Sequence, residues 1–217
     1  MREYVGILRA ILAGEQPPDG ERWRTGFRFF GLDPRPDLRI YLAALSPGML
    51  RLAGEIADGV VLWLCNPEYI RDVVIPTVTE SRAAAGRPLE GFDVVAAVPS
   101  AVTDDAEAAR AVMRAELLPY FGLPFYRAMI EGSGYGEDIA AFDAASGDAE
   151  AMAGAISDPF IDALTAIGSE EDVRRGVRRY RGAGTSSPCI GPIGRSDFSA
   201  TLRAGAAEGA PSAATTH

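Results

Sequence analysis

The chain has 217 residues, with 30 acidic and 21 basic side chains and a formal net charge of −9 at pH 7. This acidic balance argues against nucleic acid or an anionic membrane surface as the main partner, and no apolar run reaches the roughly 20 residues that span a bilayer. Because the only histidine is His217 and lysine is absent, His-based triads, His metal sites and lysine Schiff bases are excluded, and any chemistry must come from a cofactor.

The first 36 residues are predicted to form a helix and then a loop. Apolar residues at positions 4, 7, 8, 11 and 12 share one helical face, and Gly14 is suited to end the helix. Since the sequence begins inside this amphipathic helix with no capping residue, we expect that sequence upstream of Met1 is missing. The Pro, Gly and Asp content of residues 16–36 predicts a loop.

Strands and helices then alternate. The pattern predicts strands over 38–45, 60–65 and about 92–98, with helices over 47–57 and 67–85 between them. Ser46-Pro47 and Asn66-Pro67 supply a capping residue and a first-turn proline for these helices. Continuous apolar strands that alternate with helices indicate a parallel sheet covered on both faces.

The second half is predicted to be mainly helical before one last strand. A helix over 106–118, several shorter helices up to Ile167 and a helix from Ser169 to Arg181 precede a fourth strand at 188–191. The Ala/Gly/Ser/Thr composition from about Ala204 predicts a disordered tail. We therefore divide the chain into one folded region, 1–203, and a tail, 204–217.

The two cysteines, Cys65 and Cys189, each lie in an apolar run and not in a Cys-rich framework. We expect both to be buried, reduced thiols of a cytoplasmic protein, and neither to bind metal. Cys65 is a poor candidate nucleophile because no histidine or lysine is available to form its thiolate.

Ligands bind at the C-terminal ends of strands in parallel α/β folds, whereas the opposite end serves stability. Asp58 and Asp93 stand at strand starts and are interpreted as structural. The residues that stand at or just beyond strand ends are Ser46, Asn66, Ser100, Thr103 and Arg195.

The best candidate site is the segment from Leu45 to Met49. The N–H groups of Gly48 and Met49, the Ser46 hydroxyl and the positive end of the helix together would form an anion-binding site. The alternative is an ordinary capped helix. Trp63, at the end of the second strand, would line a ring-binding pocket or else pack in the core.

Four stretches carry a resemblance to a known family: REYVGILRAILAGE, IYLAALSPGMLRLAGEIADGVVLW, NPEYI and IDALTAIGSEEDVRRGVRRYRGAG. In this order, over most of Arg2–Pro192, they resemble the luciferase-like monooxygenase superfamily, above all its F420-dependent (LLM class) oxidoreductases. The resemblance implies a TIM (β/α)8-barrel fold, here an incomplete barrel of about four parallel strands with a helical insertion before the last one. Because a complete barrel needs about 250 residues, the chain is expected to be N-terminally truncated.

The resemblance also implies functional positions. Ala43, Ala44, Leu45 and Ser46 match the stretch whose backbone contacts the phosphate-bearing tail of the cofactor, next to Gly48 and Met49. Trp63 and Asn66 match a strand end that faces the ring and the substrate, where some members have a lysine for a sugar phosphate. Asn66 argues against such a substrate, and no catalytic residue is assigned.

The expected function is that of a deazaflavin- or flavin-dependent oxidoreductase or monooxygenase. The cofactor would be coenzyme F420, with FMN as the alternative, the substrate a small molecule, and assembly into a homo-oligomer remains open. Two other functions compete with this one. The first is a non-catalytic half-barrel that binds a partner or an anionic cofactor only. The second is a flavodoxin-like binding domain, which the long helical stretch before the last strand disfavours.

Overall fold

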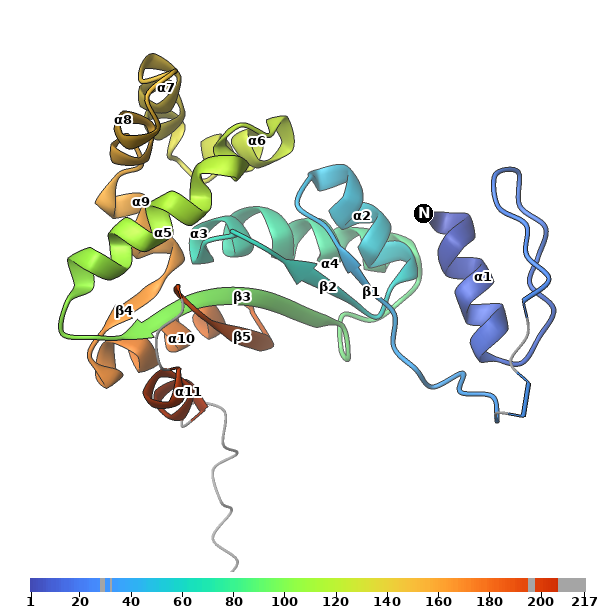
Figure 1. Cartoon of the computed structure of the whole chain (residues 1–217). Helices are drawn as coiled ribbons and strands as arrows, with labels where there is room; N and C mark the ends of the chain where they lie inside the picture. The colour runs from blue at the N-terminus through green and yellow to red at the C-terminus, as the bar shows by residue number, and fades with distance from the viewer. Residues whose placement is uncertain (28–29, 32, 195–197, 207–217) are drawn as a thin grey trace, which may run out of the picture.

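A five-stranded parallel sheet organises the chain (Figure 1). The computed structural model describes residues 1–27, 30–31, 33–194 and 198–206. The strands are β1 (Tyr41–Ala43), β2 (Gly59–Leu62), β3 (Asp93–Val102), β4 (Ala166–Gly168) and β5 (Ser187–Pro192). Strand β3 is central, because β2, β4 and β5 all pair with it in parallel. Val95 aligns with both Val61 and Ser187, so β2 and β5 lie on opposite edges of β3.

The four predicted strands are confirmed as neighbouring parallel strands, although their lengths differ from the prediction. Strand β1 has three residues instead of the eight predicted over 38–45, and in the described chain it pairs with β2 alone. Strand β4 was missed, since its three residues lie between two helices and are too few for a periodic pattern.

Two of the helices begin directly after the capping residues that the sequence predicts. Those outside the insertion are α1 (Arg2–Leu12), α2 (Pro47–Ile56), α3 (Pro67–Tyr69), the π-helical η1 (Ile70–Val74), α4 (Ile75–Ala84), α10 (Glu170–Gly182) and α11 (Ser199–Ala206). Ser46 and Asn66 cap α2 and α3 as predicted, and Asn66 Oδ1 accepts from Tyr69 N–H at 2.8 Å. In the part of the chain that the structure describes, every helix is too short or too polar to cross a membrane.

The predicted tail begins too early. Residues 204–206 belong to α11, where Ala204 is buried and a side chain at Gly205 would have to displace the end of the Ile190 side chain. The rest of that tail, 207–217, lies outside the described residues.

The sheet has one covered and one open face. Leu42, Val60, Val94 and Ala96 are buried on the face that α2 and α10 contact. The alternate positions, which we call the open face, are Ala43, Val61, Val95, Ala97 and Cys189, and they are exposed or half-buried. The expectation of a sheet covered on both faces is therefore wrong for the described residues. Cys189 is exposed for this reason, against prediction, whereas Cys65 is buried as predicted.

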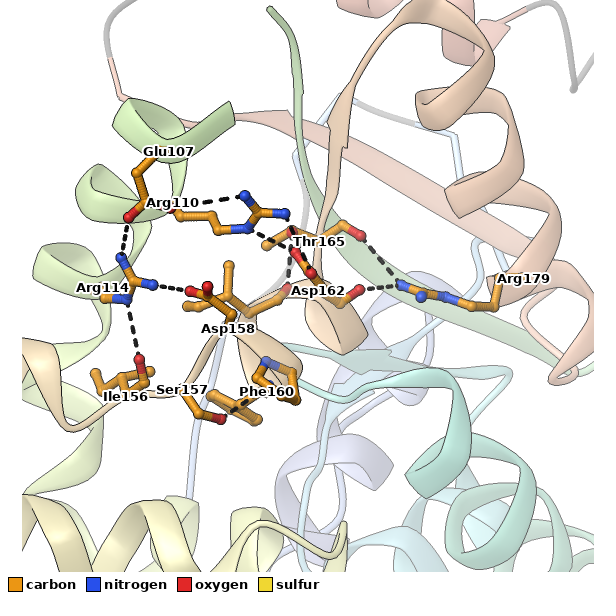
Figure 2. A network of polar contacts seen from close by, with 12 residues as sticks. Glu107, Arg110, Arg114, Ile156, Ser157, Asp158, Phe160, Asp162, Thr165 and Arg179 are labelled. Atoms are coloured by element: carbon orange, nitrogen blue, oxygen red, sulfur yellow. Dashed lines mark hydrogen bonds and ion pairs between the residues drawn. The ribbon is translucent and has the colours of Figure 1, made fainter. Parts of the chain in front are cut away.

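The helical insertion is built from α5 (Ala106–Phe121), α6 (Pro124–Gly132), α7 (Gly136–Ala144), α8 (Ala149–Gly154) and α9 (Asp158–Leu164). Figure 2 shows how arginines join α5 and α9. Arg114 pairs with Glu107 at 3.0 Å and with Asp158, and Arg110 Nε donates to Asp162 Oδ1 at 2.9 Å. These contacts join α5, which follows β3, to α9, which precedes β4. The two ends of the insertion are therefore held together beside the C-terminal end of β3.

Asp58 and Asp93 make structural contacts at strand starts, as predicted. Asp58 accepts from Ile40 N–H at 2.9 Å and pairs with Arg9 and Arg87 at 2.9 and 3.1 Å. Asp93 accepts from the Ser187 hydroxyl at 2.9 Å. The Arg9 pair also ties α1 to the start of β2, beside the α2 helix (Figure 1).

Candidate functional site

The connection from β1 to α2 forms one wall of the candidate site. Ala44 N–H donates to Val61 O at 3.3 Å, which extends the pairing of β1 with β2, and the chain then turns into α2 at Ser46. Ser46 Oγ accepts from Met49 N–H at 3.4 Å, a long hydrogen bond. A Cβ added at Gly48 would meet no atom within 4 Å apart from its chain neighbours and its own helix, and Ser46, Pro47 and Gly48 are all exposed, so the N-terminal end of α2 is accessible to a ligand.

A cavity of about 430 Å³ lies beside this turn. Its lining residues are Ala43, Ala44, Leu45, Ser46, Met49, Val61, Trp63, Phe125 and Tyr126. Six of the eight residues predicted from the sequence thus line one cavity. Gly48 stands at the adjoining helix start and Asn66 does not line the cavity.

The end of β2 places Trp63 in the cavity through an unusual turn. Leu64 has φ 60°, a left-handed conformation that is uncommon for a residue with a side chain. Beside it, Trp63 remains 39% exposed while Leu64, Cys65 and Asn66 are buried. Of the two roles left open for Trp63, the structure favours the pocket over the core.

Asn66 is 1% exposed and uses its carbonyl oxygen as the cap of α3. Its Nδ2 is buried and has no hydrogen-bond partner among the described residues. The capping oxygen gives Asn66 a structural role, whereas the expected contact of this side chain with a substrate stays a prediction.

The environment of Cys65 is unsuited to a nucleophile. Burial raises the pKa of its thiol, which keeps the sulfur protonated, and Sγ lies 3.4 Å from Met129 Sδ in α6. Ser100 and Thr103, also considered from their places at the end of β3, make local contacts: the Ser100 hydroxyl donates to Val98 O, and Thr103 accepts from Asp105 N–H. Arg195 lies outside the described residues.

Sequence reasoning missed three lining residues, Val61, Phe125 and Tyr126. Val61 belongs to the open face of the sheet, and the two aromatic residues come from α6 in the helical insertion. The aromatic run from Tyr120 to Tyr126 was a signal in the sequence. Its place beside β1 and β2 depends on how the insertion folds back, which no local pattern encodes.

The cavity is mainly apolar, and none of the described side chains that line it carries a formal charge. Its side-chain polar groups are the Ser46 hydroxyl, the Trp63 ring N–H and the Tyr126 phenol. Burial, together with nearby Tyr120, raises the pKa of Tyr126, so this phenol stays protonated at neutral pH. The geometry suits a ligand with an anionic group at the start of α2 and uncharged rings in the cavity.

Residues 1–187 match the family model described as luciferase-like monooxygenase. The chain is 29% identical over 203 residues to the 5,10-methylenetetrahydromethanopterin reductase of Archaeoglobus fulgidus, covering 89% of this chain and 60% of that protein. It is 31% identical over 115 residues to the F420-dependent glucose-6-phosphate dehydrogenase of Nocardia farcinica, covering 50% of this chain and 33% of that protein.

Solved structures of F420-dependent enzymes also match this chain. The coenzyme F420-dependent tetrahydromethanopterin reductase of Methanopyrus kandleri matches with a TM-score of 0.76 and 26% identity, over 94% of this chain and 60% of that one. An F420-dependent secondary alcohol dehydrogenase matches in fold, with a TM-score of 0.64 and 17% identity, over 93% of this chain and 58% of that one. The chain spans about 60% of the length of these reductases. Its sheet is of the TIM-barrel type found in these neighbours, and the chain belongs to the luciferase-like monooxygenase family.

Proposed function

We propose that this protein is a cytoplasmic oxidoreductase that uses coenzyme F420, with FMN as the alternative cofactor, to act on a small molecule. Family membership and the F420-dependent relatives support this proposal. The observation that carries it is the open N-terminal end of α2 beside an apolar cavity. Because the chain spans about 60% of the reductases' length, the activity is proposed for the whole protein.

The residues present fit such a cofactor. The N–H of Gly48 and the helix end would hold the phosphate-bearing tail, and the missing side chain lets it approach the backbone closely. Ala43 and Ala44 leave room at the strand end for the tail to pass, and the cavity walls would contact the ring system. When bound and reduced, a deazaflavin supplies the hydride that the side chains of this site cannot supply.

Gly48→Glu tests the cofactor site. The substitution should raise the Kd for F420 by at least about tenfold, by steric block and by repulsion at the helix end. Gly48→Gln has the same bulk without charge and should give a smaller effect. Gly6→Glu, in α1, adds the same charge at another open position and should leave the Kd unchanged. An unchanged Kd for Gly48→Glu, measured by F420 fluorescence titration, would contradict the assignment.

The open face and the edge of β1 that no described strand pairs favour a second candidate, a non-catalytic half-barrel that binds a partner or an anionic cofactor only. Turnover measurements with reduced F420 and a range of carbonyl acceptors separate the two. Binding of the cofactor without turnover of any acceptor would favour the second candidate.

A further inference from the structure

Four aromatic rings form a continuous row beside the cavity, and three of them, those of Trp63, Phe125 and Tyr126, line it. We call Trp63, Tyr120, Phe125 and Tyr126 the aromatic wall. The ring centroids of Trp63 and Tyr120 are 6.2 Å apart, those of Tyr120 and Tyr126 are 4.9 Å apart, and those of Tyr126 and Phe125 are 4.8 Å apart. The two ends of this row line the cavity and are partly exposed, Trp63 to 39% and Phe125 to 53%.

The aromatic wall is fixed at both ends. Trp63 belongs to the turn that ends β2, whereas Phe125 and Tyr126 belong to α6, whose residues Met129 and Ile130 are buried. The contact between Cys65 Sγ and Met129 Sδ, at 3.4 Å, joins α6 to the same turn. Because the turn and the helix that carry the rings are held before any ligand binds, little backbone entropy is lost when a flat molecule packs against them.

Arg127 holds the start of α6 from the opposite side. Its guanidinium donates to Phe121 O at 3.1 Å and to Asp143 Oδ1 at 2.9 Å. The charge that lies nearest to the aromatic wall along α6 is thereby directed to α7 and not to the cavity, whose lining has no charged side chain.

We infer that the aromatic wall selects an uncharged substrate with a flat, apolar body, such as an aryl ketone or aryl aldehyde. This inference rests on the proposed function, because it assigns the α2 side of the cavity to the cofactor and the α6 side to the substrate. An anionic substrate would find no cation among the described residues that line the cavity, and it would compete with the cofactor phosphate for the end of α2. A cavity volume of about 430 Å³, part of which the cofactor would fill, limits the substrate to a small molecule.

The test compares two probes of one shape on the full chain. The probes are 2-acetylnaphthalene, which is neutral, and 2-naphthoate, which carries a carboxylate. The chain has two tryptophans, so the Trp23→Phe variant leaves Trp63 as the single tryptophan reporter in the cavity. Quenching of Trp63 fluorescence should give a Kd for the neutral probe at least about tenfold lower than for the anion.

Phe125→Ala removes the most exposed ring of the wall and should raise the Kd of 2-acetylnaphthalene by about fivefold to tenfold. Leu123→Ala is the matched control, because Leu123 is 38% exposed just before α6 and does not line the cavity. Melting temperatures of both variants should equal that of the parent, which shows that any loss of binding is local.

The outcomes separate this inference from the proposed function. If the naphthoate binds as tightly as the ketone, or if Phe125→Ala leaves the ketone's Kd unchanged, the inference is wrong even though F420 binds. If Phe125→Ala weakens F420 and the ketone equally, the aromatic wall holds the cofactor and the inference is also wrong. If the ketone binds at the wall but F420 does not bind at all, the proposed function fails while the selectivity of the wall stands.

Discussion

The hydroxyl group of Tyr69 donates a hydrogen bond to the backbone carbonyl oxygen of Leu45, at 2.9 Å. This contact links the first turn of the helix after β2 to the connection after β1, where the candidate cofactor site lies. Burial raises the pKa of Tyr69 to about 12, so the hydroxyl is a donor throughout the working pH range. Tyr69 therefore positions Leu45 and Ser46 without lining the cavity itself.

Replacing Tyr69 by Phe should lower the free energy of unfolding by about 1 kcal/mol and raise the Kd for F420 several-fold. The carbonyl of Leu45 loses its donor, and the turn at Ser46 becomes less well fixed. Tyr180→Phe is the control, since the buried Tyr180 hydroxyl donates to Leu164 O at 2.7 Å, away from the cavity. It should cost similar stability and leave the Kd unchanged. Equal effects of both variants on F420 would show that Tyr69 contributes only to stability.

Asp58 should make stability depend on acid pH. Burial alone would raise the pKa of Asp58, but the hydrogen bond from Ile40 and the ion pair with Arg9 lower it below the usual 3.8. A carboxylate whose pKa is lower in the folded chain stabilises the fold above its unfolded pKa. This contribution is lost as the pH falls through the folded value.

Asp58→Asn should therefore cost about 2 kcal/mol at pH 7 and progressively less below about pH 4. Urea denaturation at a series of pH values measures the difference. Asp37→Asn, which breaks an exposed pair with Arg35, should have little effect at any pH. A stability difference for Asp58→Asn that is the same at pH 3 and pH 7 would show that charge is not its cause.

Arg179 should stabilise the chain by closing the end of α9. Its Nη2 donates to the carbonyl oxygens of Asp162 and Ala163 at 2.7 and 2.9 Å, as Figure 2 shows in part. Arg179→Met keeps the aliphatic stem but leaves helix-terminal carbonyls without this donor, at a cost of about 1–2 kcal/mol. Arg175→Met, which breaks an exposed pair with Asp172, should cost clearly less. Thermal unfolding of the two variants compares them directly.

The open face should make the chain bind a hydrophobic dye or associate with itself, because apolar side chains on this face are left in water. Replacing Val61 and Val95 by Thr keeps the strand-forming shape and should reduce both effects. The same change at Val60 and Val94, on the covered face, should instead lower stability. A cooperatively melting monomer that binds no dye would show that this face is protected in solution.

Local signals gave correct predictions where the cause is local. Ser46-Pro47 and Asn66-Pro67 start helices because a side-chain acceptor and a fixed φ act within one turn. The same local signal grouped Leu45 to Met49, whereas Ala43 and Ala44 were assigned only through the resemblance to the luciferase-like family. Strand β4 and the contribution of Phe125 and Tyr126 could not be predicted, because a three-residue strand has no period and α6 reaches the cavity only through tertiary contacts. Cys189 looked buried because an apolar run does not reveal which face of a sheet lacks a cover.

The pairing pattern of β3 also determines how the sheet can come apart. Strands β2, β4 and β5 each pair with this one ten-residue strand, and β1 reaches it only through β2. By this pattern, separation of β4, of β5, or of β2 together with β1 would leave the other neighbours paired with β3. Loss of β3 would leave β1 and β2 as the only paired strands of the described sheet. The cavity wall at β2 and the insertion near β4 therefore both depend on β3 being folded, although these regions lie far apart in the sequence.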